Sequence, residues 1–187
     1  MKHPFYAFEG VDAAGKTTPA KLLAEHLSGE YYHNPPEVLR GMRTRMDSSP
    51  PTIRYLYYLL GNFVASEEIK VLLESRPVVA DWYIYSTVAF HSAALDRNLD
   101  VPEGLLLPDK IIHVTASLET IEARLRERQD TGKYSAIDFL RRVIPHYERL
   151  FAPQQNVIRI DTTYKSPEET ARAIITALTL SVHSKQP

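Results

Sequence analysis

Residues 10–17 read Gly10-Val11-Asp12-Ala13-Ala14-Gly15-Lys16-Thr17, and Thr18 follows them directly. This segment matches G-x-x-x-x-G-K-[ST], the phosphate-binding loop of many nucleotide-binding proteins. The apolar run 5–8 before it predicts a buried strand, and the spacing of leucines after it predicts a helix to about Ser28. In that setting the loop N–H groups converge on phosphate oxygens, and the helix N-terminus adds partial positive charge. The sequence therefore predicts a nucleoside triphosphate site.

Most residues of this loop have an expected role in binding ATP. Lys16 is expected to reach the β- and γ-phosphates and to serve catalysis, while the Thr17 hydroxyl would bind Mg²⁺. The residues expected to contact ATP are Gly10, Ala13, Ala14, Gly15, Lys16, Thr17 and Thr18.

Composition narrows the class of protein. A chain of 187 residues with 44% hydrophobic residues is long enough for one core, so a single domain over residues 1–187 is expected. The formal net charge of −1 gives no basic field for nucleic acid, and the absence of cysteine excludes disulfides and thiolate metal sites. No apolar run is long enough for a membrane span. Because residues 1–4 lead straight into the first strand, no signal peptide is expected and the cytoplasm is the default location.

The rest of the chain alternates between expected strands and helices. Further strands are expected at 30–33, 78–81, 109–115 and 157–161, and helices at 38–46, 52–74, 86–95, 117–128 and 135–151. A capping box at 166–169 predicts a final helix, with a frayed tail at 181–187. The polar, glycine-containing break at 129–133 lies within a predicted lid at about 126–136. This alternation predicts a three-layer α/β/α fold around a five-stranded parallel sheet.

Several motifs resemble the thymidylate kinase family, a group of P-loop nucleoside monophosphate kinases. They are Glu9-Gly10-Val11-Asp12, Val79-Ala80-Asp81 and the arginine-rich segment before Asp130. Pro35-Pro36, Leu60-Gly61-Asn62, Tyr85-Ser86-Thr87 and Leu107-Pro108-Asp109 resemble in particular the thymidylate-kinase-like domain of mitochondrial UMP–CMP kinase. The resemblance covers roughly residues 4–180. It implies transfer of the ATP γ-phosphoryl group, with Mg²⁺, to a (deoxy)pyrimidine nucleoside monophosphate of the dTMP, dUMP, UMP or CMP class. With the apolar helix 52–74, it also implies a homodimer.

Two acids are expected at the reaction centre. Asp81 ends a buried strand near the loop, so Asp81 and Thr17 are the expected Mg²⁺ ligands; the alternative for Asp81 is a helix-capping carboxylate. Asp12 lies inside the loop, where thymidylate kinases use an acid to bind a sugar hydroxyl near the acceptor. The alternative for Asp12 is a turn-forming residue that bonds its own backbone.

The catalytic cations are expected from the lid. Thymidylate kinases carry an arginine either in the glycine loop or in the lid, and Ala13 and Ala14 exclude the first arrangement here. Arg124 and Arg128 share one helix face, and Arg128 is favoured because it lies nearer the lid. Arg126 is assigned to a solvated face, paired with a neighbouring glutamate.

The sequence indicates the acceptor-binding residues less clearly than the ATP-binding residues. Tyr58 or Phe63 on the long helix would stack on a base, and His91 would either face the base or simply pack. Arg43 and Arg54 would hold the acceptor phosphate, with plain surface charge as the alternative for each.

Two positions depart from the family. Trp82 follows the strand-end acid where the family usually has an arginine that binds the acceptor phosphate. Either Arg43, Arg54 or a lid arginine substitutes for it, or the acceptor is uncharged. Phe63 stands where thymidylate kinases often carry a base-reading arginine, which argues against strict thymine specificity.

The leading hypothesis is a nucleoside monophosphate kinase; the alternatives are a kinase of an uncharged acceptor such as a nucleoside, and a nucleotide-binding regulator without turnover.

Overall fold

One parallel sheet of five strands organises the computed structural model, which describes residues 3–129 and 132–183. The strand order is β2-β3-β1-β4-β5. The strands are β1 (Phe5–Glu9), β2 (Glu30–His33), β3 (Val78–Asp81), β4 (Lys110–Thr115) and β5 (Val157–Asp161). All four pairings are parallel. The predicted sheet is confirmed, and its strands lie close to the predicted segments.

The central strands are apolar because both faces of the sheet are covered. Phe8 of β1 pairs in register with Asp81 of β3 and with Ile112 of β4, and all three are buried. The carboxyl ends of the strands therefore share one edge. This edge is where a parallel sheet positions a ligand.

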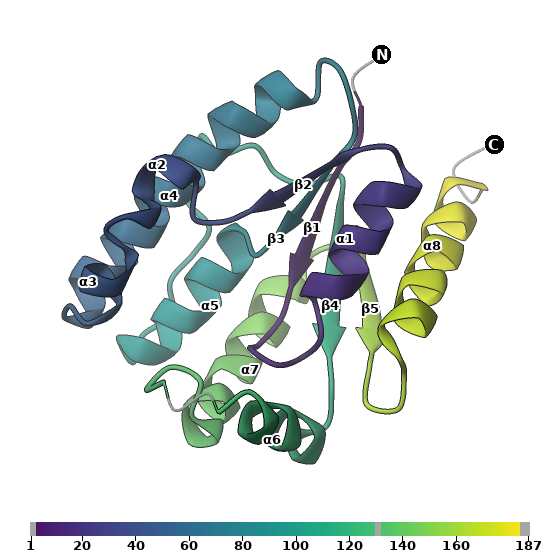
Figure 1. Ribbon diagram of the computed structural model, residues 1–187. Coiled ribbons are helices and arrows are strands. Elements are labelled where there is room, and N and C mark those ends of the chain that lie inside the picture. Colours follow the sequence, from purple (N-terminus) through teal and green to yellow (C-terminus); the bar gives the residue numbers. More distant parts are fainter. Residues whose placement is uncertain (1–2, 130–131, 184–187) are drawn as a thin grey trace.

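Helices cover both faces of the sheet, which confirms the three-layer fold (Figure 1). They are α1 (Thr17–His26), α2 (Glu37–Arg40), α3 (Arg43–Asp47), α4 (Pro51–Leu72), α5 (Ile84–Ala94), α6 (Leu118–Glu127), α7 (Ile137–Phe151) and α8 (Pro167–His183). The helices α1 and α8 pack together, while α5 packs against both α4 and α7. Within the described residues, none of these helices combines the length and the apolar character that a bilayer span requires.

The structure differs from the sequence-based expectation at two helices. The single helix expected at 38–46 is divided into α2 and α3, which Gly41 and Met42 separate. Met42 N bonds to Leu39 O three residues back, so the chain makes a tight turn there instead of continuing one helix. At the other end of the chain, α8 continues to His183, so the first part of the tail expected to fray is helical. Residues 184–187 lie outside the described residues.

The predicted helix caps are confirmed by hydrogen bonds. Ser117 Oγ accepts from Thr120 N at 3.2 Å and caps α6. Ser166 and Glu169 form the reciprocal capping box of α8, with Ser166 N donating to Glu169 Oε2 at 2.7 Å and Glu169 N donating to Ser166 Oγ at 3.2 Å. These caps set the directions in which α6 and α8 leave the carboxyl edge of the sheet.

Candidate functional site

A cleft of about 500 Å³ lies at the carboxyl edge of the sheet. Its walls come from the segments that follow four of the strands, together with α4 and the end of α6. The residues predicted for the site that border the cleft are Asp12, Ala13, Gly15, Lys16, Thr17, Thr18, Arg43, Arg54, Tyr58, Asp81, Trp82, Arg124 and Arg128. The structure thus brings both predicted acids and most of the predicted cations to one cavity.

The phosphate-binding loop requires its first glycine for steric reasons. Gly10 has φ +145°, and a Cβ atom built there would lie 2.2 Å from the carbonyl oxygen of Val114 in β4. No side chain fits at that distance, so the loop leaves β1 in close contact with the neighbouring strand. Gly10 itself shapes the turn and is not among the residues that border the cleft.

Lys16 folds back over its own loop. Its Nζ donates to Gly10 O at 2.9 Å and to Val11 O at 2.7 Å, and the residue is 7% exposed. These bonds hold the ammonium group against the loop at the border of the cleft, where phosphates would bind. Ala14 is fully buried and donates its N–H to Val11 O at 3.3 Å, so it stabilises the turn of the loop from its buried side.

Arg124 of α6 stabilises the phosphate-binding loop through hydrogen bonds. Its Nη1 donates to Ala13 O at 3.2 Å and to Thr162 Oγ1 at 3.0 Å, and its Nη2 donates to Thr162 O at 3.0 Å. Thr162 Oγ1 in turn donates to Ala14 O at 2.7 Å. Partial burial, together with the nearby charge of Arg128, lowers the pKa of Arg124. Most of the contacts of Arg124 are to backbone, which suits a residue that shapes the loop more than one that moves with the reaction.

The other two arginines of this segment, Arg126 and Arg128, differ in their surroundings as expected. Arg126 pairs with Glu122 at 2.8 Å and its side chain is 75% exposed, which confirms its assignment to a solvated face. Arg128 is the last residue of the α6 turn and borders the cleft. Arg128 therefore faces the site from the start of the predicted lid. Of that lid, residues 130 and 131 lie outside the described residues.

The two predicted metal ligands border the same cleft. Asp81 ends β3, is 3% exposed and accepts a hydrogen bond from Tyr31 OH at 3.0 Å. Thr17 is the first residue of α1. Among the described residues there is no group of three or more histidines and acids that would hold a metal ion alone. A bound Mg²⁺ would thus take the rest of its ligands from nucleotide phosphates and water, which is how this ion usually binds.

The segment that joins β3 to α5 is strained and held by a buried acid. Trp82 has φ +74°, a conformation that costs on the order of 1–3 kcal/mol in a non-glycine residue. Glu9 at the end of β1 accepts hydrogen bonds from Tyr85 N at 3.2 Å, from Ser86 N at 2.9 Å and from Ser86 Oγ. Burial raises the pKa of Glu9 to about 7, although these donors act to lower it. Glu9 thereby ties the first turn of α5 to the strand that begins the phosphate loop.

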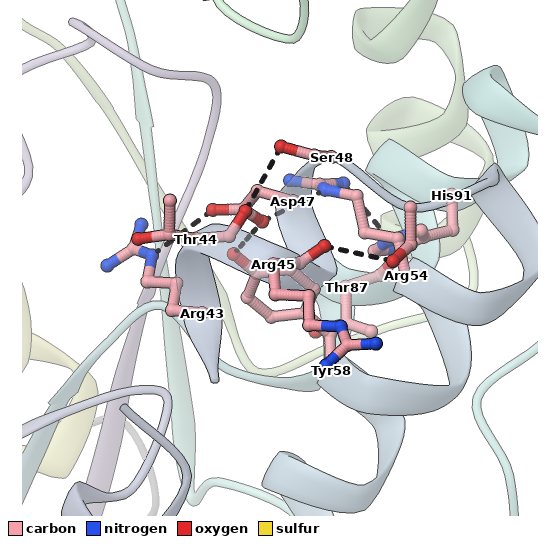
Figure 2. Close-up of polar contacts among 10 residues, drawn as sticks. Arg43, Thr44, Arg45, Asp47, Ser48, Arg54, Tyr58, Thr87 and His91 are labelled. Atoms are coloured by element: carbon pink, nitrogen blue, oxygen red, sulfur yellow. Dashed lines mark hydrogen bonds and ion pairs between the residues drawn. The ribbon is translucent and has the colours of Figure 1, made fainter. Parts of the chain in front are cut away.

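A cluster of charged and aromatic side chains forms the acceptor side of the cleft (Figure 2). Asp47 Oδ1 accepts from Arg54 Nε at 3.2 Å and from Tyr58 OH at 2.8 Å, while Asp47 Oδ2 lies 3.5 Å from Arg43 Nε. The guanidinium carbon of Arg54 lies 4.8 Å from the ring centre of Tyr58 and 3.9 Å from that of Tyr134. Arg54 and Tyr58 also border a second chamber of about 430 Å³ beside the main cleft.

His91 supports this cluster from behind. It is fully buried, and its Nδ1 lies 2.7 Å from Thr87 O, which can only accept, so Nδ1 carries the proton. The other nitrogen, Nε2, is then an acceptor, and Arg54 Nη1 donates to it at 3.0 Å. Burial and the charge of Arg54 lower the pKa of His91 to about 3, so the imidazole is neutral near pH 7.

Two of the residues predicted to contact the acceptor do not reach the cleft. His91 is enclosed by α4 and α5 and acts through Arg54, so the prediction that it faces the base is wrong. Phe63 is 38% exposed and lies beside Gly104, away from both chambers, because it is on the outer face of α4. Of the two aromatic residues predicted to stack on a base, Tyr58 borders the cleft, and it is 2% exposed.

Several residues that line the site were not predicted from the sequence. Thr162 and Lys165 follow β5, His33 is the last residue of β2 and Asn34 follows it, so both pairs lie at the same carboxyl edge as Asp81. Their position at or just after the ends of predicted strands was the available signal. The contact of Tyr134 with Arg54 joins segments 80 residues apart and had no comparable signal in one sequence.

Comparison with known proteins agrees with this arrangement. A family model described as thymidylate kinase matches residues 8–174. A probable thymidylate kinase of Methanocaldococcus jannaschii is 34% identical over 179 residues, which cover 91% of this chain and 93% of that protein. Human mitochondrial UMP–CMP kinase 2 is 29% identical over 192 residues, covering 93% of this chain and 43% of that protein.

The fold is also that of a solved member of this group. The thymidylate kinase structure from Candida albicans superposes with a TM-score of 0.80 at 18% identity, covering 96% of this chain and 92% of that one. The family model spans most of the sequence. This chain belongs to the thymidylate kinase family.

Proposed function

We propose that this protein transfers the γ-phosphoryl group of MgATP to the phosphate of a pyrimidine (deoxy)nucleoside monophosphate, with dTMP as the first acceptor to test. The observation that carries the proposal is a single cleft bordered by the phosphate loop, Asp12 included, together with Asp81 at the end of β3 and Arg54 of α4. Membership of the thymidylate kinase family supports the same reaction, since its relatives carry that name.

The residues divide between the two substrates. The loop amides and Lys16 would hold the β- and γ-phosphates of ATP, and Arg128 would approach the transferred group from the lid at 126–136. Thr17 and Asp81 would hold Mg²⁺, and the bound ion would neutralise charge on the β- and γ-phosphates. Because phosphoryl transfer requires little covalent work from the protein, alignment and charge neutralisation account for most of the catalysis.

The acceptor would lie on the opposite wall. Asp12 borders both chambers and would accept a hydrogen bond from a sugar hydroxyl. Trp82 borders the cleft and would offer its ring to a base, and the buried Tyr58 supports it edge to face with ring centres 5.2 Å apart. Arg43 and Arg54 are the cations on this side of the cleft that would meet the acceptor phosphate.

A second candidate function is phosphorylation of a nucleoside. The observation that favours it is Trp82, which places an apolar ring directly after Asp81, where the family usually has a cation. In that case Arg54 would serve the fold through its pairing with Asp47, and the acceptor would carry no phosphate.

An ADP-release assay separates these functions. Purified protein with MgATP is tested against dTMP, dUMP, UMP and CMP and against the matching nucleosides, with and without EDTA. The proposal expects turnover of monophosphates that requires Mg²⁺. Faster turnover of nucleosides would replace it by the second candidate, and ATP binding without turnover of any acceptor would favour a regulator.

The partners beyond the substrates are also proposals. A homodimer is proposed because α4 carries exposed Ile53, Leu56 and Leu60 along one face. No nucleic-acid partner is proposed, in line with the formal net charge of −1. The cytoplasm is the proposed location.

A further inference from the structure

Arg54 is unusually confined for a cation that borders an open cleft. Its side chain is 7% exposed, and its described hydrogen bonds go to Asp47 through Nε and to His91 through Nη1. Tyr58 and Tyr134 lie against the guanidinium group. Side-chain rotamers are costly to restrict, so binding to an already ordered guanidinium loses less entropy than binding to a free one.

The partners of Arg54 do not cancel its charge. His91 is neutral, with burial lowering its pKa to about 3, so it orients the guanidinium without adding a negative charge. Asp47 is shared with Arg43, which leaves two positive charges for one carboxylate in the cluster. The cluster therefore keeps one positive charge in excess beside the cleft, in the region where Trp82 brings no cation.

We infer that Arg54 is the residue that binds the phosphate of the acceptor, and that His91 is a positioning residue that orients it. The inference rests on the proposed function, because it assumes an acceptor that carries a phosphate. The guanidinium fork suits this task, since two parallel N–H groups can bond two oxygens of one phosphate.

Arg43 is the weaker candidate on geometry. Its side chain is 49% exposed and its one described ion pair, with Asp47, is at 3.5 Å. A long exposed arginine must be ordered on binding, which opposes part of what its charge contributes. Arg45 provides a matched control, because it is an exposed arginine of the same helix, α3, that borders neither chamber.

Tyr134 connects this subsite to the lid. It belongs to the segment between α6 and α7, and its ring lies 3.9 Å from the guanidinium carbon of Arg54. Tyr134 and Tyr58 therefore both lie against the guanidinium group of Arg54.

The test uses Trp82, the only tryptophan of the chain, which borders the cleft and reports binding through its fluorescence. The wild type, Arg54→Ala and Arg45→Ala are titrated with dTMP and thymidine, and with CMP and cytidine, without ATP. Arg54→Ala is expected to weaken binding of the monophosphate roughly thirtyfold and to leave binding of the nucleoside unchanged. Arg45→Ala is expected to match the wild type.

His91→Phe tests the positioning role. Phenylalanine keeps a ring against Tyr55 and Tyr58 but removes the acceptor for Arg54 Nη1. We expect a several-fold loss of monophosphate affinity with nucleoside affinity retained, and no such loss when His91→Phe is added to Arg54→Ala. A purely structural role for His91 would weaken both ligands alike.

The outcomes separate this inference from the proposed function. Equal binding of monophosphate and nucleoside by the wild type in both pairs, or an unchanged preference in Arg54→Ala, overturns the role of Arg54. A preference that depends on Arg54 without turnover of any monophosphate supports the inference and overturns the proposed function. Thermal unfolding of each variant shows whether a loss of binding reflects a loss of folded protein.

Discussion

At the scale of single residues, Lys16 combines a structural and a catalytic task. Its ammonium bonds two carbonyls of the loop and would also bond the transferred phosphate. We expect Lys16→Ala to lower phosphoryl transfer by roughly 10³-fold or more, because this cation stabilises charge that develops in the transition state. The measurement is ADP release at saturating ATP. Lys21→Ala, an exposed lysine one turn further along α1, is the control and should keep full activity.

The same variant separates catalysis from folding. Loss of Lys16 leaves two loop carbonyls without a donor, so a modest fall in melting temperature is expected with an unchanged far-ultraviolet spectrum. Turnover by Lys16→Ala close to that of the wild type would contradict the enzymatic assignment.

Arg128 and Arg126 lie two residues apart but have different surroundings. Arg128 borders the cleft, whereas Arg126 is paired with Glu122 and exposed. We expect Arg128→Ala to lower kcat about 100-fold with little change in the KM for ATP, because a bond made mainly in the transition state affects kcat and kcat/KM alike. Steady-state kinetics with ATP varied at saturating acceptor measure this. Equal losses in Arg126→Ala would show that the effect is not specific to Arg128, and would contradict its assignment as the catalytic arginine.

At the scale of elements, Glu9 joins β1 to α5. The folded-state pKa of Glu9 is about 7, above the ordinary value of 4.5, so between those values the folded protein holds a proton that the unfolded chain has released. Its contribution to stability is therefore complete below pH 4.5 and is lost as the pH rises through 7, by about 3 kcal/mol at most. Urea unfolding at pH 5 and pH 8 measures it.

Two buried histidines change stability in the opposite direction, so a control is required. Burial lowers the pKa of His91 to about 3 and that of His113 to about 4, and both contributions rise as the pH increases toward 6.5. Glu9→Gln retains the histidines and removes the titration of the acid. We expect the difference in stability between the wild type and Glu9→Gln to fall from pH 5 to pH 8. A difference independent of pH would show that Glu9 titrates normally.

The order of elements was predictable from the sequence because each strand and helix carries its own periodic pattern and cap. Ser117 and the 166–169 capping box placed two helix starts within a residue. The region 37–47 was less predictable, because Gly41 is a weak signal and the division into α2 and α3 depends on packing against α4.

The site was predictable where residues follow strands and unpredictable where side chains meet across the fold. The phosphate loop and Asp81 lie at strand ends, so position alone indicated them. Arg54 and His91 meet because α4 packs on α5, and only that packing shows that His91 serves Arg54 and does not face the base. Phe63 was misassigned because a linear motif does not say which face of a long helix is buried.

At the scale of the whole molecule, one face of α4 exposes large apolar side chains to solvent. Its large apolar side chains recur at helical spacing and are 38–66% exposed: Ile53, Leu56, Leu60, Phe63 and Val71. Val38 and Met42, beside α4 in the α2 region, are exposed as well. The opposite face of α4 carries Arg54 and Tyr58 into the cleft. A partner on the outer face would thus stiffen the helix that holds the acceptor subsite.

We therefore expect Leu56→Glu to dissociate the proposed homodimer and to weaken acceptor binding. A charge in the middle of the apolar stripe would be buried without a counter-charge, and such a change disfavours association by several kcal/mol. Light scattering after size-exclusion chromatography measures the mass, and the KM for the monophosphate is compared with that for ATP. Tyr164→Glu, at a position 96% exposed after β5, is the control and should leave both mass and KM unchanged.

A wild type that is monomeric at micromolar concentration would contradict the dimer. A dissociated Leu56→Glu with an unchanged acceptor KM would instead show that α4 holds its position without a partner, so that the packing of α4 on α5 alone orders Arg54.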